Sequence, residues 1–214
     1  MKVMDSHIES LLKRYPALEA CAEDISAAID CLAASFRQGC KLMVAGNGGS
    51  AADSEHIVGE LMKEFRLKRR ILGPQASSLM AADNEMGRYL ADNLQGALPS
   101  ICLVGQSALS TAFMNDSNAD LLFAQQVYGY GVGGDVFWAL STSGNSANIC
   151  YAAVAAKAKG IKVIALTGAK ESRLSALADI AIRVPAEITS EIQELHLPVY
   201  HCICAALEDI FFNE

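Results

Sequence analysis

Five short runs of nearly continuous apolar residues mark the chain, and longer segments with a helical period separate them. The runs are KLMVAG (41–46), SICLVG (100–105), DVFWALS (135–141), KVIALTG (162–168) and IAIRVP (180–185). Such continuous apolarity is typical of strands covered on both faces of a sheet. Helical patterns are clearest in SAADSEHIVGELMKEF, NADLLFAQQVYGYG and NSANICYAAVAAKAKG. The alternation predicts an α/β fold with a parallel sheet.

Two apolar helical segments lie outside this alternation. One runs from the N-terminus through about Arg37 (segment 1–38), and the other from about Thr189 to Phe212. Their content of Leu, Ile, Ala and Cys needs covering, and a bundle formed with other subunits would supply it. We therefore expect an oligomer.

The segment from Ile71 to Leu98 also interrupts the alternation. Its stretch MAADNEMGRYLADNLQGAL reads as one helix between the helix after the first strand and the second strand. We interpret residues 71–98 as an insertion of the kind that serves as a lid or an interface element. Residues 1–214, with this insertion and the N-terminal segment included, are interpreted as one domain.

Composition narrows the class of protein. The chain has 214 residues, 52% of them hydrophobic, which suffices for one core. Seven scattered cysteines form no CxxC pair, as expected for thiols in a reducing cytoplasm. The N-terminal helix carries charges unlike a signal peptide, and we expect no segment of transmembrane length and no membrane partner. A net charge of -7 argues against nucleic acid as a partner, and the basic run from Lys63 to Arg70 is read as a solvated helix end.

Two polar turns follow predicted strands and precede predicted helices. They are GNGGS (46–50) and STSGNS (141–146). Hydroxyls and free amide groups at a helix N-terminus favour an anion, and ligands of such sheets collect at the strand ends. Ser50 and Ser146 are also ordinary N-cap residues, but STSGNS holds more hydroxyls than capping requires. Because no P-loop lysine and no full dinucleotide motif is present, a sugar phosphate is the favoured ligand.

The candidate chemistry lies in two windows. His56 and Glu60 are spaced i, i+4 and share a helix face, which suits two ligands of one metal, a base beside its partner, or a solvated pair. The second window is IQELHLPVYH (192–201), which contains Gln193, Glu194, His196 and His201.

The order of these motifs resembles one known family. GNGGS, a following His and Glu, FMND (113–116), STSGNS and IQE with two later histidines are similar to the phosphoheptose isomerases, the sedoheptulose 7-phosphate isomerases of the sugar isomerase (SIS) domain class. The similarity runs from about Leu42 to Glu208, outside the interpreted insertion. It implies a flavodoxin-like sheet, a homotetramer, one zinc ion per site, and a role in heptose biosynthesis for lipopolysaccharide or capsule.

The resemblance also implies roles for individual residues. Substrate contacts fall on Asn47, Gly48, Gly49, Ser50, Glu60, Asn115, Asp116, Ser141, Thr142, Ser143, Ser146 and Gln193. Metal ligands fall on His56, Glu60, Gln193 and His201, with Glu60 as the base and His201 as the acid. Isomerisation of a ketose to an aldose moves a proton between adjacent carbons through an enediol. A carboxylate base for that step needs tuning by its surroundings or by the metal, and how Glu60 divides between ligand and base stays open.

One spacing bears on the metal site. Eight residues of straight helix span roughly 12 Å, so Gln193 and His201 reach one ion only at full stretch. Either Pro198 distorts the helix between them, or a neighbouring subunit supplies some ligands. We therefore expect active sites shared between subunits.

Two departures and one alternative accompany the resemblance. Ser190 stands where many relatives have an Asp, and AKES (169–172) replaces a double glycine. Relatives that act as sugar-phosphate-binding regulators of replication initiation, without catalysis, keep the fold but lose the Glu of the first helix and the second His of the last. This chain keeps Glu60 and His201, which favours an enzyme.

Overall fold

The computed structural model describes residues 3–213, with side chains from residue 6 onward, and its centre is a five-stranded sheet. The strands are β1 (Leu42–Ala45), β2 (Ser100–Cys102), β3 (Val136–Leu140), β4 (Lys162–Thr167) and β5 (Ile180–Arg183). All neighbouring pairs are parallel. The five predicted strands and the parallel sheet are confirmed, and each strand is somewhat shorter than its apolar run.

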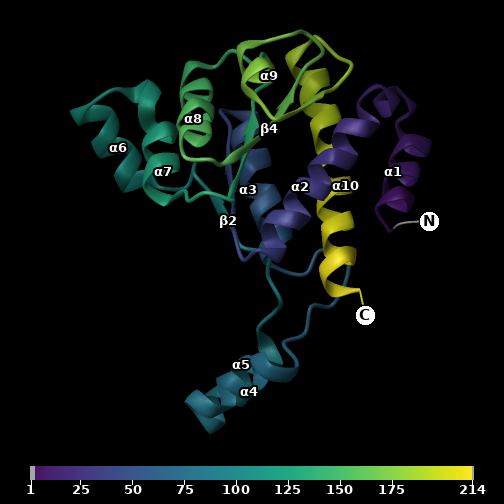
Figure 1. Cartoon of the computed structure of the whole chain (residues 1–214), viewed down its shortest axis with the longest axis vertical. Coiled ribbons are helices and arrows are strands. Elements are labelled where there is room, and N and C mark those ends of the chain that lie inside the picture. The colour runs from purple at the N-terminus through teal and green to yellow at the C-terminus, as the bar shows by residue number, and fades with distance from the viewer. Residues whose placement is uncertain (1–2, 214) are drawn as a thin grey trace.

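Helices cover both faces of the sheet (Figure 1). Val44 and Trp138 face a core made with α1 (Val3–Arg14), α2 (Ala22–Arg37), α3 (Gly49–Met62) and α10 (Thr189–Phe212). Met43 and Phe137 face a second core made with α7 (Leu122–Tyr130), α8 (Ala147–Ala158) and α9 (Arg173–Leu177). The short helices η1 (Pro16–Cys21) and η2 (Ala119–Leu121) and helix α6 (Ser107–Asp116) complete the body. Because adjacent strand residues face opposite cores, both faces had to be apolar.

The strand order places the site. It is β2-β1-β3-β4-β5, so the chain crosses from β1 to one side first and to the other side next. In doubly wound sheets of this flavodoxin-like order, ligands bind where the direction of crossing reverses, at the carboxyl ends of the strands on either side. Here those strands are β1 and β3, and the two polar turns of the sequence follow them.

The terminal helices cover one another within a single chain. Leu11 of α1, Ile25 and Leu32 of α2, and Ile203 and Leu207 of α10 are all 0% exposed and belong to one core cluster. The apolar content of these helices therefore does not by itself require other subunits, and that reason for expecting an oligomer is wrong.

Helix α10 has another notable property. Its 24 residues reach a mean hydropathy of 1.2 in an 18-residue window, which is long and apolar enough for a membrane span. The expectation that no segment reaches that length is therefore wrong for α10. Since 61% of the window is buried inside the protein, the helix is built as a core helix.

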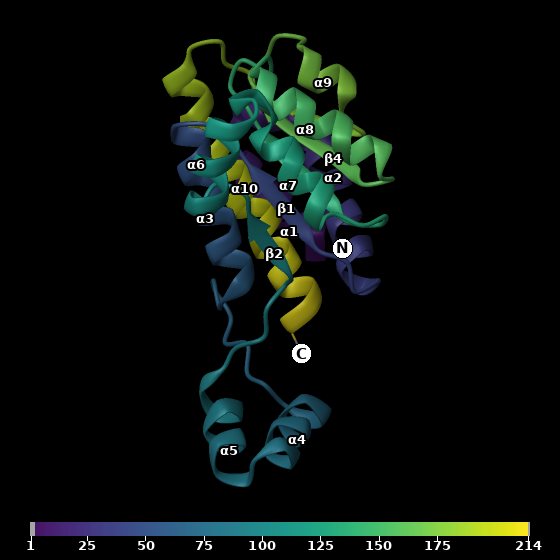
Figure 2. The same cartoon turned by 90° about the vertical axis from the view of Figure 1, so that its left-hand side faces the viewer.

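The segment after α3 forms a projecting arm, which we define as residues 73–93. It holds two helices, α4 (Gly73–Ala82) and α5 (Asn84–Asn93), and extends away from the body (Figures 1 and 2). The prediction of one helix through this region is wrong because Asp83 is extended and its side chain accepts hydrogen bonds from Glu85 N and Met86 N. Asp83 thereby caps a new helix.

Candidate active site

The first polar turn bends sharply between β1 and α3. Gly48 has φ of +56°, a left-handed conformation that favours glycine. Gly49 opens α3, and a Cβ there would lie 2.5 Å from Nε2 of Gln193 on α10. The backbone conformation thus favours glycine at Gly48, and Gly49 leaves room for the end of the Gln193 side chain.

The second polar turn lies between β3 and α8. Gly144 has φ of +62°, and Ser141 Oγ lies 3.1 Å from Ser146 Oγ across the turn. Ser143 instead accepts a hydrogen bond of 3.2 Å from Asn145 N with its hydroxyl oxygen. The hydroxyls of Ser141 and Ser146 are therefore close enough to bind the same anion.

The two turns are joined by a pair of amides. Asn47 and Asn148 exchange two hydrogen bonds of 2.9 Å, each side chain donating one and accepting one. Between the turns lies a cavity of about 260 Å³, which we call the loop cavity. Its lining residues are Asn47, Gly48, Gly49, Ser50, Leu140, Ser141, Thr142, Ser146, Thr189 and Gln193.

The chemistry of the loop cavity suits a phosphate. Its lining contains hydroxyls, amides and glycine backbone but no charged side chain. The N-termini of α3 and α8 both begin beside it, where unpaired backbone N–H groups and the helix dipole favour an anion. An anion would be held here by neutral donors.

Helices α3 and α10 lie side by side and run in the same direction away from this cavity. Gly49 meets Gln193 at the start, and His56 meets Tyr200 further along. Just past the end of α3, Phe65 N bonds Glu208. The window with His56 and Glu60 and the window 192–201 are thus brought together along one line of contact between α3 and α10.

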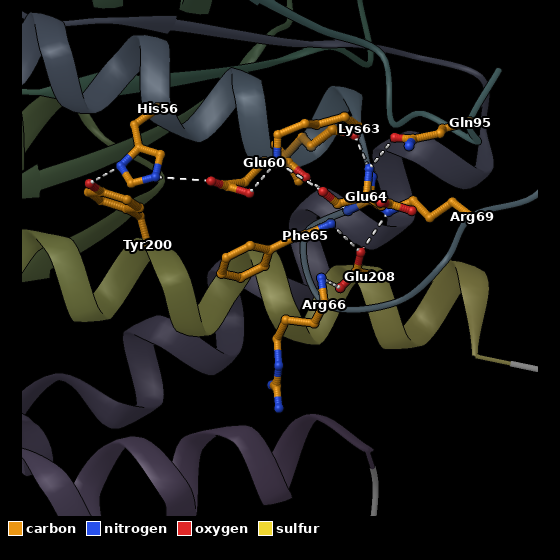
Figure 3. A network of polar contacts seen from close by, with 11 residues as sticks. His56, Glu60, Lys63, Glu64, Phe65, Arg66, Arg69, Gln95, Tyr200 and Glu208 are labelled. Carbon is orange, nitrogen blue, oxygen red and sulfur yellow. Dashed lines mark hydrogen bonds and ion pairs between the residues drawn. The ribbon is translucent and has the colours of Figure 1, made fainter. Parts of the chain in front are cut away.

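The middle of this line holds a connected polar group, which we call the His–Glu cluster and define as Asp53, His56, Glu60, Tyr200 and His201. His56 Nε2 lies 3.0 Å from Glu60 Oε1, and His56 Nδ1 lies 3.0 Å from Tyr200 Oη (Figure 3). Tyr200 also donates to Asp53 Oδ1 at 3.2 Å. The His56 and His201 rings are 5.0 Å apart between centroids.

Glu60 is largely buried, and both of its carboxylate oxygens have a polar partner. Its side chain is 11% exposed, whereas that of His56 is 43% exposed. Lys63 Nζ lies 3.2 Å from the second oxygen, Oε2. Each oxygen of the Glu60 carboxylate therefore has a donor. Solvent lies near the carboxylate because its partner His56 is partly exposed.

Burial sets the protonation of the neighbours. Burial, followed by the nearby His56, lowers the pKa of His201, so its imidazole is neutral at neutral pH. Burial raises the pKa of Tyr200 and of Asp53, which face each other. A neutral imidazole is the form that binds a metal or accepts a proton.

His201 also borders a second cavity, of about 460 Å³, on the side of α1. Arg14 and Arg66 line it with His7, and Arg14 contributes to the lowered pKa of His201. The remaining lining residues are Ser10, Phe65, Cys202 and Ala205. The charge of Arg14 on this side thus adds to the lowering of the His201 pKa that burial mainly causes.

The structure brings together three of the four predicted metal ligands. His56, Glu60 and His201 lie in the His–Glu cluster, whereas Gln193 lies two turns earlier on α10 and lines the loop cavity. Helix α10 continues through Pro198 without a break. Among residues 3–213, no three His, Cys, Asp or Glu side chains stand close enough for a metal. Nevertheless, imidazole and carboxylate are donors that zinc prefers, and His201 Nε2 is buried without a hydrogen-bond partner.

Other predicted residues lie elsewhere. Asn115 and Asp116, at the end of α6, are exposed and bond each other at 2.8 Å, outside the lining of the loop cavity. His196 is 0% exposed in the core and takes no part in the cluster.

Sequence reasoning missed Asp53, Lys63, Asn148, Thr189 and Tyr200. For three of these residues, a sequence position close to a predicted site residue or turn could have indicated a role. Asn148 follows the second polar turn, Tyr200 precedes His201, and Lys63 follows Glu60 by three residues, just past the end of α3.

A parallel sheet with two polar turns at its carboxyl end is the arrangement expected of a SIS-domain protein. Comparisons with known proteins agree with this class. The family model described as SIS domain matches residues 6–88 and 90–168. A phosphoheptose isomerase from Rhodospirillum rubrum is 40% identical over 88% of this chain and 87% of its own length. One from Shewanella denitrificans is 33% identical over 100% and 97%.

Solved structures of phosphoheptose isomerases are also similar to this chain. The structure of phosphoheptose isomerase GmhA from Neisseria gonorrhoeae superposes with a TM-score of 0.74 at 28% identity, covering 96% of each chain. The chain belongs to the phosphoheptose isomerase family of SIS-domain proteins.

Proposed function

We propose that this protein isomerises sedoheptulose 7-phosphate to glycero-manno-heptose 7-phosphate through an enediol. The observation that carries the proposal is the line of contact between α3 and α10, which begins at a phosphate-type cavity and passes a buried Glu paired with His56. The reported relatives are named as enzymes, which supports catalysis over the regulator alternative.

In this proposal the loop cavity binds the phosphate and the His–Glu cluster transfers the protons. The loop cavity holds the phosphate through Ser141, Ser146 and the backbone N–H groups that open α3 and α8. Glu60 takes a proton from C1 of the ketose while the C2 carbonyl oxygen gains one from an acid, which gives the enediol. Return of a proton to C2, with loss of the O1 proton, gives the aldose. In this proposal His56 and Lys63 orient the carboxylate, and His201 exchanges the oxygen-bound protons.

We also propose one zinc ion per site, held by His56, Glu60, Gln193 and His201. When bound, zinc would polarise the carbonyl oxygen of the substrate. The unpartnered Nε2 of His201 and the nearby His56 support this donor set, whereas Gln193 must move or come from another chain. Metal analysis of purified protein tests it, since the His56→Ala and His201→Ala variants should each lose zinc while an exposed control, Glu64→Gln, retains it.

We further propose a homotetramer in the cytoplasm with sites shared between subunits. Glu60 lies eleven residues after Gly49, or ~16 Å along the helix, whereas acid–base groups act within hydrogen-bond reach. If a second chain supplied part of the site, the phosphate-binding groups and the acid–base groups that act on one substrate would lie closer together. All seven cysteines are unpaired, as suits a reducing compartment.

Mixed oligomers test the sharing of sites. Chains carrying Asn47→Ala and chains carrying His201→Ala are unfolded together and refolded as a mixture. If sites are shared, some of them receive both wild-type residues, and the mixture exceeds either parent in activity. A mixture no more active than its parents, in oligomers shown by mass to be mixed, contradicts sharing.

The reaction itself is tested by nuclear magnetic resonance in deuterated water. With sedoheptulose 7-phosphate, the aldose should appear with deuterium at C2, because the enediol is reprotonated from a group that exchanges with solvent. Binding of the sugar phosphate with neither aldose formation nor deuterium uptake would instead support the non-catalytic regulator.

A further inference from the structure

The end of helix α3, which carries Glu60, is held by a buried arginine from the following segment. Arg69 has a side chain that is 0% exposed, and it makes three hydrogen bonds (Figure 3). Nη1 donates to Leu61 O at 2.8 Å, and Nη2 donates to Glu60 O at 2.9 Å. These carbonyls belong to the last turn of α3, where no further helical N–H is available to them. The guanidinium therefore caps the turn that presents Glu60.

The third bond of Arg69 ties this turn to α10. Nε donates to Oε1 of Glu208, whose side chain is also 0% exposed, at 2.8 Å. Glu208 accepts two more hydrogen bonds of 2.8 Å, from Phe65 N and Arg66 N. One carboxylate thus fixes both Arg69 and the chain immediately after α3.

Glu208 lies on the same helix as His201, seven residues later. Seven residues are close to two full turns, so both side chains leave the same side of α10, the side that faces α3. Glu60 and His201 are therefore set relative to each other by two rigid helices and by the Arg69–Glu208 pair that joins their ends.

We propose that Arg69 and Glu208 are positioning residues, which hold Glu60 in register with His56 and His201 without touching substrate. This rests on the proposed role of Glu60 as the base. Stability alone is a weak reason for the pair, because burying two charges costs about as much as their attraction returns. Placement is a stronger one, since a shift of about 1 Å in a reacting group lowers a rate by about 100-fold.

The chain offers a matched control at the opposite end of the sheet. Asp135, with a side chain 0% exposed, accepts from Lys41 N at 3.0 Å, from Val132 N at 2.8 Å and from Lys41 Nζ at 2.6 Å. Like Glu208, it receives two backbone N–H groups and one cation. Since it precedes β3, whereas the polar turns follow the strands, it lies away from the site.

The test compares Arg69→Lys and Asp135→Asn with the wild type by kcat, KM and melting temperature. Lysine keeps the charge beside Glu208 but lacks the fork that reaches both carbonyls. We expect Arg69→Lys to lower kcat by roughly 10- to 100-fold with KM within about twofold. Asp135→Asn should lower the melting temperature and leave kcat of the folded protein unchanged.

A double variant guards against simple unfolding. Arg69→Met with Glu208→Leu removes both charges together, so no buried charge is left unpaired. A folded double variant with kcat within about twofold of wild type overturns the proposal, as does an equal loss of kcat in Asp135→Asn. An inactive wild-type protein would instead refute the proposed function, and an active Glu60→Gln variant would refute the role of Glu60.

Discussion

Near the start of the contact between α3 and α10, Gly49 and Gln193 border a cavity of neutral hydroxyl and amide groups. Further along, His56, Glu60 and His201 meet among ionisable side chains. The first region is made by two turns with fixed backbone conformations, whereas the second depends on how α10 packs against α3. Binding and chemistry are therefore assigned to separate regions, and substitutions in each should affect different kinetic constants.

The largest effect is expected from Glu60→Gln. Glutamine keeps the shape of the side chain but cannot take a proton, so kcat should fall by roughly 10³-fold while KM changes little. Steady-state kinetics with sedoheptulose 7-phosphate measures both constants. Glu64→Gln, four residues later and exposed, is the control and should match the wild type. A Glu60→Gln enzyme with normal kcat would show that another residue is the base. It would also contradict the assignment of chemistry to the His–Glu cluster.

The loop cavity should respond in the opposite way. Replacing Ser141 and Ser146 by Ala removes two hydroxyls that face the same site, so KM should rise by roughly 30-fold while kcat stays within a few-fold. Isothermal titration with inorganic phosphate should show the same loss of affinity. Ser78→Ala on the exposed arm is the control. A fall in kcat with unchanged KM would show that the two regions are not separate.

This contrast explains which parts of the protein could be predicted from sequence. The strands and the two turns were predictable because buried parallel strands and glycine-rich turns have local signatures, as at Gly48. The position of α10 was not, since it depends on long-range packing that sets Tyr200 against His56. The sequence motifs around Gln193 and His201 could be found, but not the fact that one lines the loop cavity and the other the His–Glu cluster.

The arm illustrates a further limit. A single residue, Asp83, turns one apparent helix into two by leaving the helical conformation and capping the second. Its effect depends on a backbone conformation that the periodicity of the surrounding apolar residues does not reveal. Asn115 and Asp116 show the reverse case, because a recognisable motif lies on α6 outside the cavity lining of this single chain.

Tyr200→Phe should have a smaller effect than either change above. Loss of the hydroxyl leaves His56 Nδ1 and Asp53 without their shared partner, so His56 is less firmly oriented toward Glu60. One hydrogen bond is worth about 1 kcal/mol, which predicts a roughly fivefold fall in kcat. The exposed Tyr151→Phe on α8 is the control. An unchanged kcat would remove Tyr200 from the His–Glu cluster.

His196 should have the smallest effect on activity, although it lies on α10 between Gln193 and His201. Burial lowers its pKa from 6.5 to about 4, so the folded protein keeps it neutral while the unfolded chain protonates it below pH 6.5. Its contribution to stability is therefore full above pH 6.5 and is lost as the pH falls toward 4, by about 3 kcal/mol in total. Urea unfolding at pH 7 and pH 4.5 should show a weaker pH dependence in His196→Leu, with kcat at pH 7 unchanged. If the variant keeps the full pH dependence, another group causes it; if it loses kcat, the chemistry extends along α10 toward the loop cavity, and the two regions act as one.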